Sequence, residues 1–119
     1  MQKPVMIVED NRDVQEVLCI VLEDEGYEVV TAANGAQALE KLQNVQPALV
    51  LLDYMMPVMN GATFIHELEA RGMRDDMHIV LLTASGEGRR RAHEMGVDAA
   101  LDKPFDVDHL LDVVATWTE

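Results

Sequence analysis

The stretch LVLLDYMMPVMNG, residues 49–61, joins the pattern of a buried strand to a negative charge. Four apolar residues run directly into the carboxylate of Asp53, and the segment closes on Asn60-Gly61. A short, continuous apolar run bounded by turn residues is typical of a strand covered on both faces. Because a buried carboxylate is costly without a partner, Asp53 must either cap the following loop as an Asx-turn or lie at the rim of a sheet.

The rest of the chain alternates apolar runs with helical periodicity. We predict strands over residues 5–8, 27–32, 48–52, 78–82 and 99–101, and helices over residues 11–25, 34–44, 62–71, 87–95 and 106–116. The first helix should carry one apolar stripe made of Val14, Val17, Leu18, Val21 and Leu22. Gly26 and Pro47 are natural stops for the first two helices, and Asp106 is a natural N-cap for the last.

Alternating strands and helices predict an α/β fold with a mostly parallel sheet and helices on both faces. The runs VMIV, LVLL and IVLL are continuously apolar and should be central, whereas YEVVTA and AAL suit the edges. Right-handed crossovers then favour the strand order 2-1-3-4-5. In such a sheet the ligand site lies beyond the carboxyl ends of the strands, between the first and the third.

Polar residues follow four of the predicted strands. They are Glu9-Asp10 after the first, Asp53 after the third, Thr83 after the fourth and Lys103 after the fifth. Because parallel strands end at the same rim, three carboxylates should converge there. Like charges at such short distances repel one another unless a cation binds between them. Oxygen ligands of this kind suit a hard divalent ion, Mg²⁺ above all. Three negative charges would then be balanced by Mg²⁺ and Lys103.

Each of these residues also has a purely structural interpretation. Asp10 is a candidate cap of the first helix, although Asn11 competes for that role. Thr83 could be an ordinary strand-end hydroxyl, and Lys103 a solvated lysine beside a turn proline. Taken one at a time, these interpretations are at least as good as a functional one. Complementary chemistry at four strand ends favours a functional site.

These residues give the chain a resemblance to the receiver domain of bacterial two-component response regulators. The resemblance covers essentially the whole chain. Its marks are Glu9-Asp10, Asp53 followed by Met56-Pro57 and Gly61, Thr83-Ala84, and Lys103-Pro104-Phe105. It implies a flavodoxin-like (βα)5 fold and a signalling role rather than conventional enzymatic turnover. It also implies two kinds of partner, a sensor histidine kinase or phosphotransfer protein and a downstream protein target.

The resemblance also implies a role for each site residue. Asp53 would accept a phosphoryl group from a phosphohistidine. Asp10, Asp53 and the backbone carbonyl of Met55 would hold Mg²⁺, and Glu9 would act through metal-bound water. Thr83 would bind a phosphoryl oxygen, and Lys103 would pair with Asp53 at rest and with the phosphoryl group afterwards. Phosphoryl transfer needs positioning and charge neutralisation more than covalent help, which agrees with these roles.

The sequence departs from the family pattern at Ala100, three residues before Lys103. Receivers usually carry Tyr or Phe there: the threonine, here Thr83, moves toward the phosphate, and the ring swings into the space that it leaves. Ala84, directly after Thr83, is a further candidate switch residue. Alanine has no ring to move, so we expect a weakened or rerouted switch. Tyr54, directly after Asp53, either packs on the surface between helices or substitutes for the missing ring.

Three other functions compete with a phosphorylated receiver. A pseudo-receiver would keep the fold as an interaction module, but the intact acid pair, Asp53, Thr83 and Lys103 argue against it. An aspartyl-phosphate hydrolase would show a second Asp two residues after the first, where this chain has Met55. A flavin or nucleotide binder would want a glycine-rich or hydroxyl-rich loop after the first strand, where EDNRD would repel phosphate.

Composition limits the partners and the cellular location that we expect for the protein. A formal net charge of −13 over 119 residues argues against direct nucleic-acid binding, and the basic run Arg89-Arg90-Arg91 is typical of a solvated helix face. Cys19 lies in an apolar segment and is predicted to be a buried thiol. Because no membrane-length apolar run and no signal-peptide pattern occur, we expect a single cytoplasmic domain over residues 1–119, without an output domain.

Overall fold

The computed structural model describes residues 3–56, 59–83 and 86–118. In this part of the chain the strands are β1 (Val5–Val8), β2 (Val29–Ala32), β3 (Leu49–Asp53), β4 (His78–Thr83) and β5 (Ala99–Asp102). The helices are α1 (Arg12–Asp24), α2 (Gly35–Lys41), α3 (Gly61–Ala70), α4 (Gly88–Met95) and α5 (Val107–Thr118), with a 3-10 turn η1 (Arg74–Asp76) before β4. None of these helices is long and apolar enough to cross a membrane.

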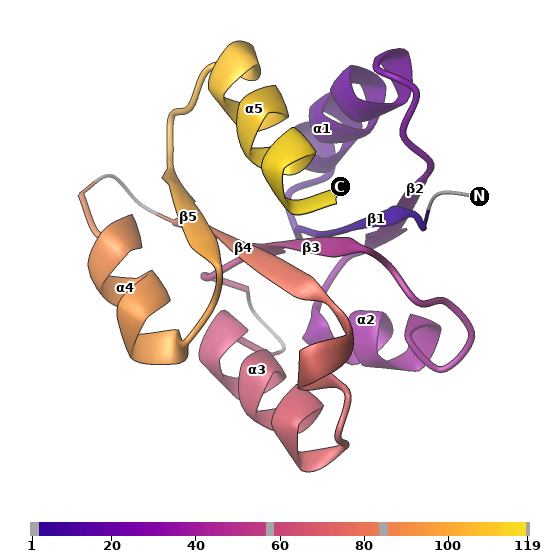
Figure 1. The fold of residues 1–119 in the computed structure, drawn as a ribbon, viewed down its shortest axis with the longest axis vertical. Helices are drawn as coiled ribbons and strands as arrows, with labels where there is room; N and C mark the ends of the chain where they lie inside the picture. The colour runs from indigo at the N-terminus through magenta and orange to yellow at the C-terminus, as the bar shows by residue number, and fades with distance from the viewer. Residues whose placement is uncertain (1–2, 57–58, 84–85, 119) are drawn as a thin grey trace.

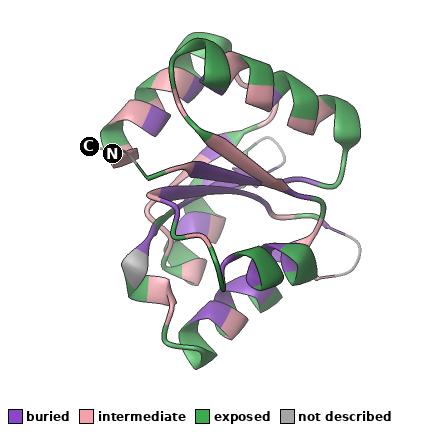
Figure 2. Cartoon of the chain, turned by 90° about the vertical axis from the view of Figure 1, so that its right-hand side faces the viewer, coloured by how far each residue is buried: buried purple, intermediate pink, exposed green. Residues whose placement is uncertain are grey.

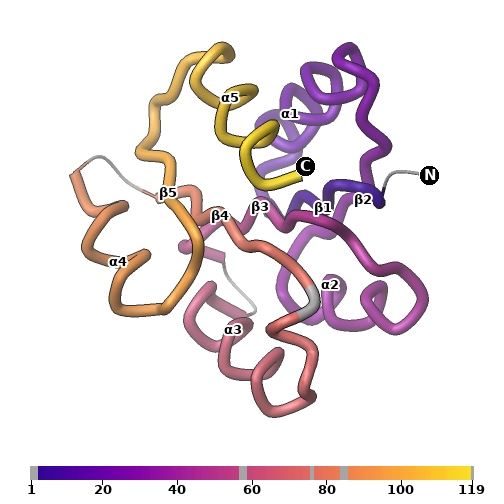
Figure 3. The backbone as a smooth tube through the Cα atoms, in the orientation of Figure 1, coloured from indigo at the N-terminus to yellow at the C-terminus, as the bar shows by residue number. Residues whose placement is uncertain are grey.

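The five strands form one parallel sheet in the order β2-β1-β3-β4-β5, as predicted. Helices α1 and α5 cover one face, and α2, α3 and α4 cover the other (Figure 1). The backbone trace shows the chain crossing from one face to the other after β2, and back again after β5 (Figure 3). The α/β architecture with helices on both faces is therefore confirmed.

The core consists of two layers, one on each face of the sheet. Every residue of β1 and β3 is buried, whereas β2 and β5 are partly exposed, which confirms the predicted central and edge strands. Exposed residues lie mainly on the outer sides of the helices (Figure 2). The apolar residues of α2, its C-cap and α3 that face the sheet are buried: Ala38, Leu39, Leu42, Phe64, Ile65 and Leu68.

Two elements lose two or more residues at one end because turn hydrogen bonds replace that end. The second strand begins at Val29 rather than Tyr27, because the Tyr27 amide donates to the Leu22 carbonyl in the turn that closes α1. The second helix ends at Lys41 rather than Asn44, where the chain tightens into hydrogen bonds three residues apart. The other boundaries differ from the predictions by one or two residues.

The apolar stripe predicted for α1 is partly wrong. Leu18 and Leu22 are buried, but Val17 is 58% exposed. Val17 lies one residue before Leu18 and is therefore rotated by about 100° toward solvent. Cys19 is half-buried rather than buried, and this burial, together with nearby Glu23 and Glu16, raises the pKa of its thiol.

Helix caps fix the segments that enter the carboxyl rim of the sheet. Asn11 caps α1 by accepting a hydrogen bond from the Val14 amide at 3.1 Å, so the cap is not Asp10. Asp106 caps α5 by accepting from the His109 amide at 2.7 Å, as predicted. Gly26 closes α1 with a φ of +93°, a conformation that suits glycine. Asp10 is thereby left available at the rim.

Candidate functional site

The strand register brings the predicted site residues to one rim. Val8 of β1 lies beside Leu52 of β3, so the residues that follow them, Glu9 and Asp53, are neighbours. Carboxylate oxygens of Glu9, Asp10 and Asp53 all lie within 4.8 Å of one another. The predicted convergence of three acids, which come from segments far apart in the sequence, is therefore confirmed.

Lys103, the residue directly after β5, provides positive charge to this cluster. Its Nζ lies 3.2 Å from Glu9 Oε1 and 3.5 Å from Asp53 Oδ2. Its backbone amide donates to the Thr83 carbonyl at 2.8 Å, which fixes the end of β5 against β4, and the Lys103–Pro104 bond is cis. The pairing with Asp53 expected at rest is present, and the closer contact is to Glu9, which the sequence did not indicate.

Asp53 combines both roles that the sequence left open. Its Oδ1 accepts a hydrogen bond from the Met55 amide at 3.2 Å, the contact of an Asx-turn. Its Oδ2 faces Lys103 at the rim. The side chain is only 7% exposed, yet it is paired with a cation, so its charge is tolerated at the edge of the core. The turn positions the carboxylate and leaves Oδ2 directed toward the cluster.

Glu9 is the most deeply buried acid of the cluster, with 1% of its surface exposed. Among the described residues, its Oε2 is a buried side-chain atom without a hydrogen-bond partner. Burial raises the pKa of Glu9 to about 8; the neighbouring Asp53 adds to the rise, and Lys103 opposes it. An unpartnered carboxylate oxygen beside two further carboxylates fits a hard divalent cation.

The remaining predicted residues divide into described and undescribed ones. Thr83 is buried at the end of β4, and Ala100 is half-buried on the face that α4 covers. Ala84 and Pro57 lie outside the described residues, so the predictions that concern them are not addressed by the structure. Met55 is 69% exposed, and its role as a carbonyl ligand remains a prediction.

Two contacts beside the site escaped the sequence analysis. The Gly88 amide at the start of α4 donates to Asp102 Oδ1 at 2.8 Å. The Arg91 guanidinium lies over the Tyr54 ring, 3.9 Å from the ring centre. Neither contact follows a local motif, because each joins residues more than ten positions apart. The sequence shows that Asp102 precedes Lys103 at the end of the fifth strand. It does not show that the carboxylate of Asp102 accepts a hydrogen bond from Gly88.

The metal-free protein should lose stability as the pH rises from about 5 to 8. The pKa of Glu9 is about 8 in the folded chain and near 4.5, the ordinary value of a glutamate, in the unfolded chain. In this window the folded state holds a proton that the unfolded state has released, so the free energy of unfolding falls with rising pH. Urea titrations in EDTA at several pH values measure this slope. Glu9→Gln should flatten it, whereas a slope unchanged in Glu9→Gln would assign it to other groups.

The family of the chain follows from comparison with known proteins. The model of the response regulator receiver domain matches residues 5–115. Among solved structures, response regulator TrrA from Thermotoga maritima, in complex with Mg(2+)-BeF, superimposes with a TM-score of 0.84 at 33% identity, over 97% of this chain and 98% of that one. The chain therefore belongs to the receiver domains of two-component response regulators, which are signalling modules.

Curated relatives differ in how much of their length the chain spans. The phosphate regulon transcriptional regulatory protein PhoB of Escherichia coli is 37% identical over 93% of this chain, but the match covers 49% of PhoB. Sporulation initiation phosphotransferase F of Bacillus subtilis is 33% identical over 98% of this chain and 94% of its own length. The chain thus spans about half the length of PhoB and nearly the whole length of sporulation initiation phosphotransferase F.

Proposed function

We propose that Asp53 is a phosphoacceptor that takes a phosphoryl group from a phosphohistidine on a sensor histidine kinase or a phosphotransfer protein. One observation carries the proposal. Asp53 lies at the end of the central strand β3, within reach of two further carboxylates and 3.5 Å from Lys103. A nucleophile at the rim of the sheet, among groups that neutralise charge, is what phosphoryl transfer requires.

The acid cluster is proposed to hold Mg²⁺. Asp10 and Asp53 would be direct ligands together with the backbone carbonyl of Met55, and Glu9 would act through water. The unpartnered Oε2 of Glu9 supports a cation here, because such an oxygen gains a partner when one binds. When bound, the ion would neutralise negative charge on the phosphoryl oxygens.

The chain's own residues account for the transfer step. A carboxylate oxygen of Asp53 forms a bond to phosphorus while the phosphorus–nitrogen bond of the donor breaks, and the electron pair of that bond returns to the imidazole. Lys103 is placed to follow the charge from the carboxylate to the phosphoryl group, since it is paired at rest and 35% exposed. Thr83, at the end of β4, would bind a phosphoryl oxygen through its hydroxyl.

The new charge on Asp53 is proposed to change the surface presented to a downstream protein. Ala100 gives this change an atypical route, because the aromatic ring usual at this position is missing. The alternative, a pseudo-receiver that signals without phosphorylation, makes the opposite prediction in the experiment below.

Incubating the chain with acetyl phosphate and Mg²⁺ should add one phosphoryl group, seen as a single mass gain in intact-protein mass spectrometry. The gain should disappear with EDTA, because the acid cluster then keeps its negative charge and repels the donor. Beryllofluoride binding with Mg²⁺ serves as a second, donor-independent measurement. No mass gain from acetyl phosphate or from a kinase donor, combined with no beryllofluoride binding, would place the pseudo-receiver function first.

A further inference from the structure

Helix α4 begins with an unfavourable turn. Its second, third and fourth residues are arginines, the first turn has no acidic residue, and the N-cap residue Glu87 makes no side-chain capping bond. Positive side chains are disfavoured beside the positive end of the helix dipole, and Gly88 lowers the helical propensity further. The position of this end of α4 therefore depends on its contacts with the rest of the molecule.

The first of these contacts holds α4 directly on β5. Gly88 donates its amide to Asp102 Oδ1 at 2.8 Å. A Cβ added at Gly88 would lie 2.6 Å from that oxygen and 3.1 Å from the Cβ of Ala100. Alternation along β5 places Ala100 and Asp102 on the same face of the sheet. Helix α4 thus packs against Ala100, in the space next to the missing aromatic ring.

The second contact joins α4 to the segment after β3. The Arg91 guanidinium lies over the ring of Tyr54, 3.9 Å from its centre, and its Nε donates to Glu87 Oε2 at 2.8 Å. The Arg91 side chain is only 22% exposed, and cation–π contacts are stronger when the cation is partly desolvated. Glu87 fixes the orientation of the guanidinium, so the contact has a defined geometry.

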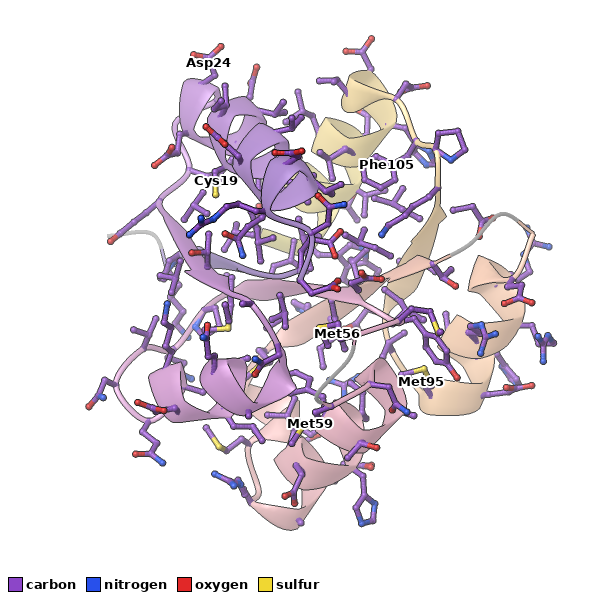
Figure 4. All side chains as sticks on the ribbon, turned by 180° about the vertical axis from the view of Figure 1, so that it is seen from behind. Cys19, Asp24, Met56, Met59, Met95 and Phe105 are labelled. Atoms are coloured by element: carbon purple, nitrogen blue, oxygen red, sulfur yellow. The ribbon has the colours of Figure 1, made fainter. Side chains whose placement is uncertain are left out.

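Tyr54 directly follows Asp53, and its backbone is anchored on two sides. Its amide donates to the Leu82 carbonyl at 2.9 Å, and its carbonyl accepts from the Gly61 amide at 3.0 Å. The Tyr54 backbone is thereby held between β4 and α3, while its ring reaches α4. Figure 4 labels Met56, two residues on, and Met95 of α4, which belong to the same apolar layer on this side of the sheet.

We propose, on the basis of the function proposed above, that Tyr54 and Arg91 are positioning residues that carry the change at Asp53 to α4. A change at Asp53 reorients the ring of Tyr54 about its anchored backbone, and the guanidinium stacked on the ring moves the first turn of α4. This contact takes the place of the ring that position 100 lacks. The Asp102 contact holds α4 on β5 but is not the carrier.

Beryllofluoride with Mg²⁺ is the phosphoryl mimic for the test, and NMR is the measurement. In the unsubstituted chain, its addition should shift three signals: the amide of Lys103, whose side chain pairs with Asp53, the Arg91 Nε–H group and the Gly88 amide. In Tyr54→Leu, the Gly88 response should fall below about half of its normal size, whereas the Lys103 response should persist, because the coupling free energy is lost without loss of binding. Arg91→Gln should act on Gly88 in the same way.

Two matched variants separate coupling from simple packing. Tyr54→Phe keeps the ring and should keep the Gly88 response. Arg90→Gln removes the same charge from the neighbouring residue, which pairs only with Glu87 and Glu94 on the described surface, and should also keep it. A packing role alone would shift the α4 signals of Tyr54→Leu before beryllofluoride is added and leave the response to it intact.

The outcomes distinguish the two proposals. A full Gly88 response in Tyr54→Leu, or a response lost equally in Tyr54→Phe, would overturn the role of the ring and point to the Asp102 contact. No Lys103 shift in the unsubstituted chain would instead contradict phosphorylation at Asp53. A Lys103 shift with silent Arg91 and Gly88 signals would leave the phosphoacceptor in place and overturn the coupling.

Discussion

Asp53→Asn is expected to abolish phosphoryl uptake completely. The amide retains an oxygen that can accept the Met55 hydrogen bond, so the turn after β3 should persist. It lacks the negative charge that attacks phosphorus and pairs with Lys103. Intact mass spectrometry after incubation with acetyl phosphate and Mg²⁺ should show a single unmodified species, where the unsubstituted chain shows one phosphoryl gain.

Stability measurements provide the control for Asp53→Asn. Asp53→Asn removes one negative charge from the crowded acid cluster but also removes an ion-pair partner of Lys103, so the midpoint of thermal unfolding should change little in metal-free buffer. A stable variant that takes up no phosphate would confirm Asp53 as the acceptor. A stable variant that still gains one phosphoryl mass would place the acceptor on another residue and contradict the proposed function.

Lys103→Gln is expected to slow phosphoryl uptake by roughly 10²- to 10³-fold, the usual effect of removing one charge-stabilising group from a transition state. Lys103 is placed 3.2 Å from Glu9 and 3.5 Å from Asp53, so its loss leaves the cluster with one positive charge fewer. The rate of mass gain at saturating Mg²⁺ measures the effect.

Lys3→Gln is the matched control for Lys103→Gln. Lys3 is exposed and precedes β1, so it lies at the opposite end of that strand from Glu9. Its replacement removes the same charge from the molecule and should leave the rate unchanged within about twofold, because screening weakens distant surface charges. Equal slowing in both variants would mean that overall charge, rather than the position of Lys103, controls the approach of the donor.

Local patterns in the sequence predicted the elements and the order of the sheet. Continuous apolar runs separated the buried strands β1, β3 and β4 from the edges, because burial on both faces leaves no room for alternation. Caps such as Asp106 and stops such as Gly26 acted within a few residues of their own position. The errors lie where tertiary packing decides: Val17 faces solvent because the sheet does not reach that side of α1.

The sequence by itself determined which chemical groups gather at the rim. Glu9, Asp10, Asp53, Thr83 and Lys103 each end or follow a strand, and a parallel sheet brings the ends of its strands together. Only the tertiary structure decided how these groups pair. It showed Lys103 closer to Glu9 than to Asp53, and it left Glu9 Oε2 unpartnered among the described residues.

The contacts of α4 were likewise decided only by the tertiary structure. Tyr54 and Arg91 are 37 positions apart in the sequence, and Gly88 and Asp102 are 14 positions apart. Periodicity indicates which side of a helix is apolar, but not where that helix settles on the sheet, because its position depends on the side chains beneath it. Because Ala100 is small, α4 lies close to β5. In this position of the helix, Arg91 contacts the ring of Tyr54.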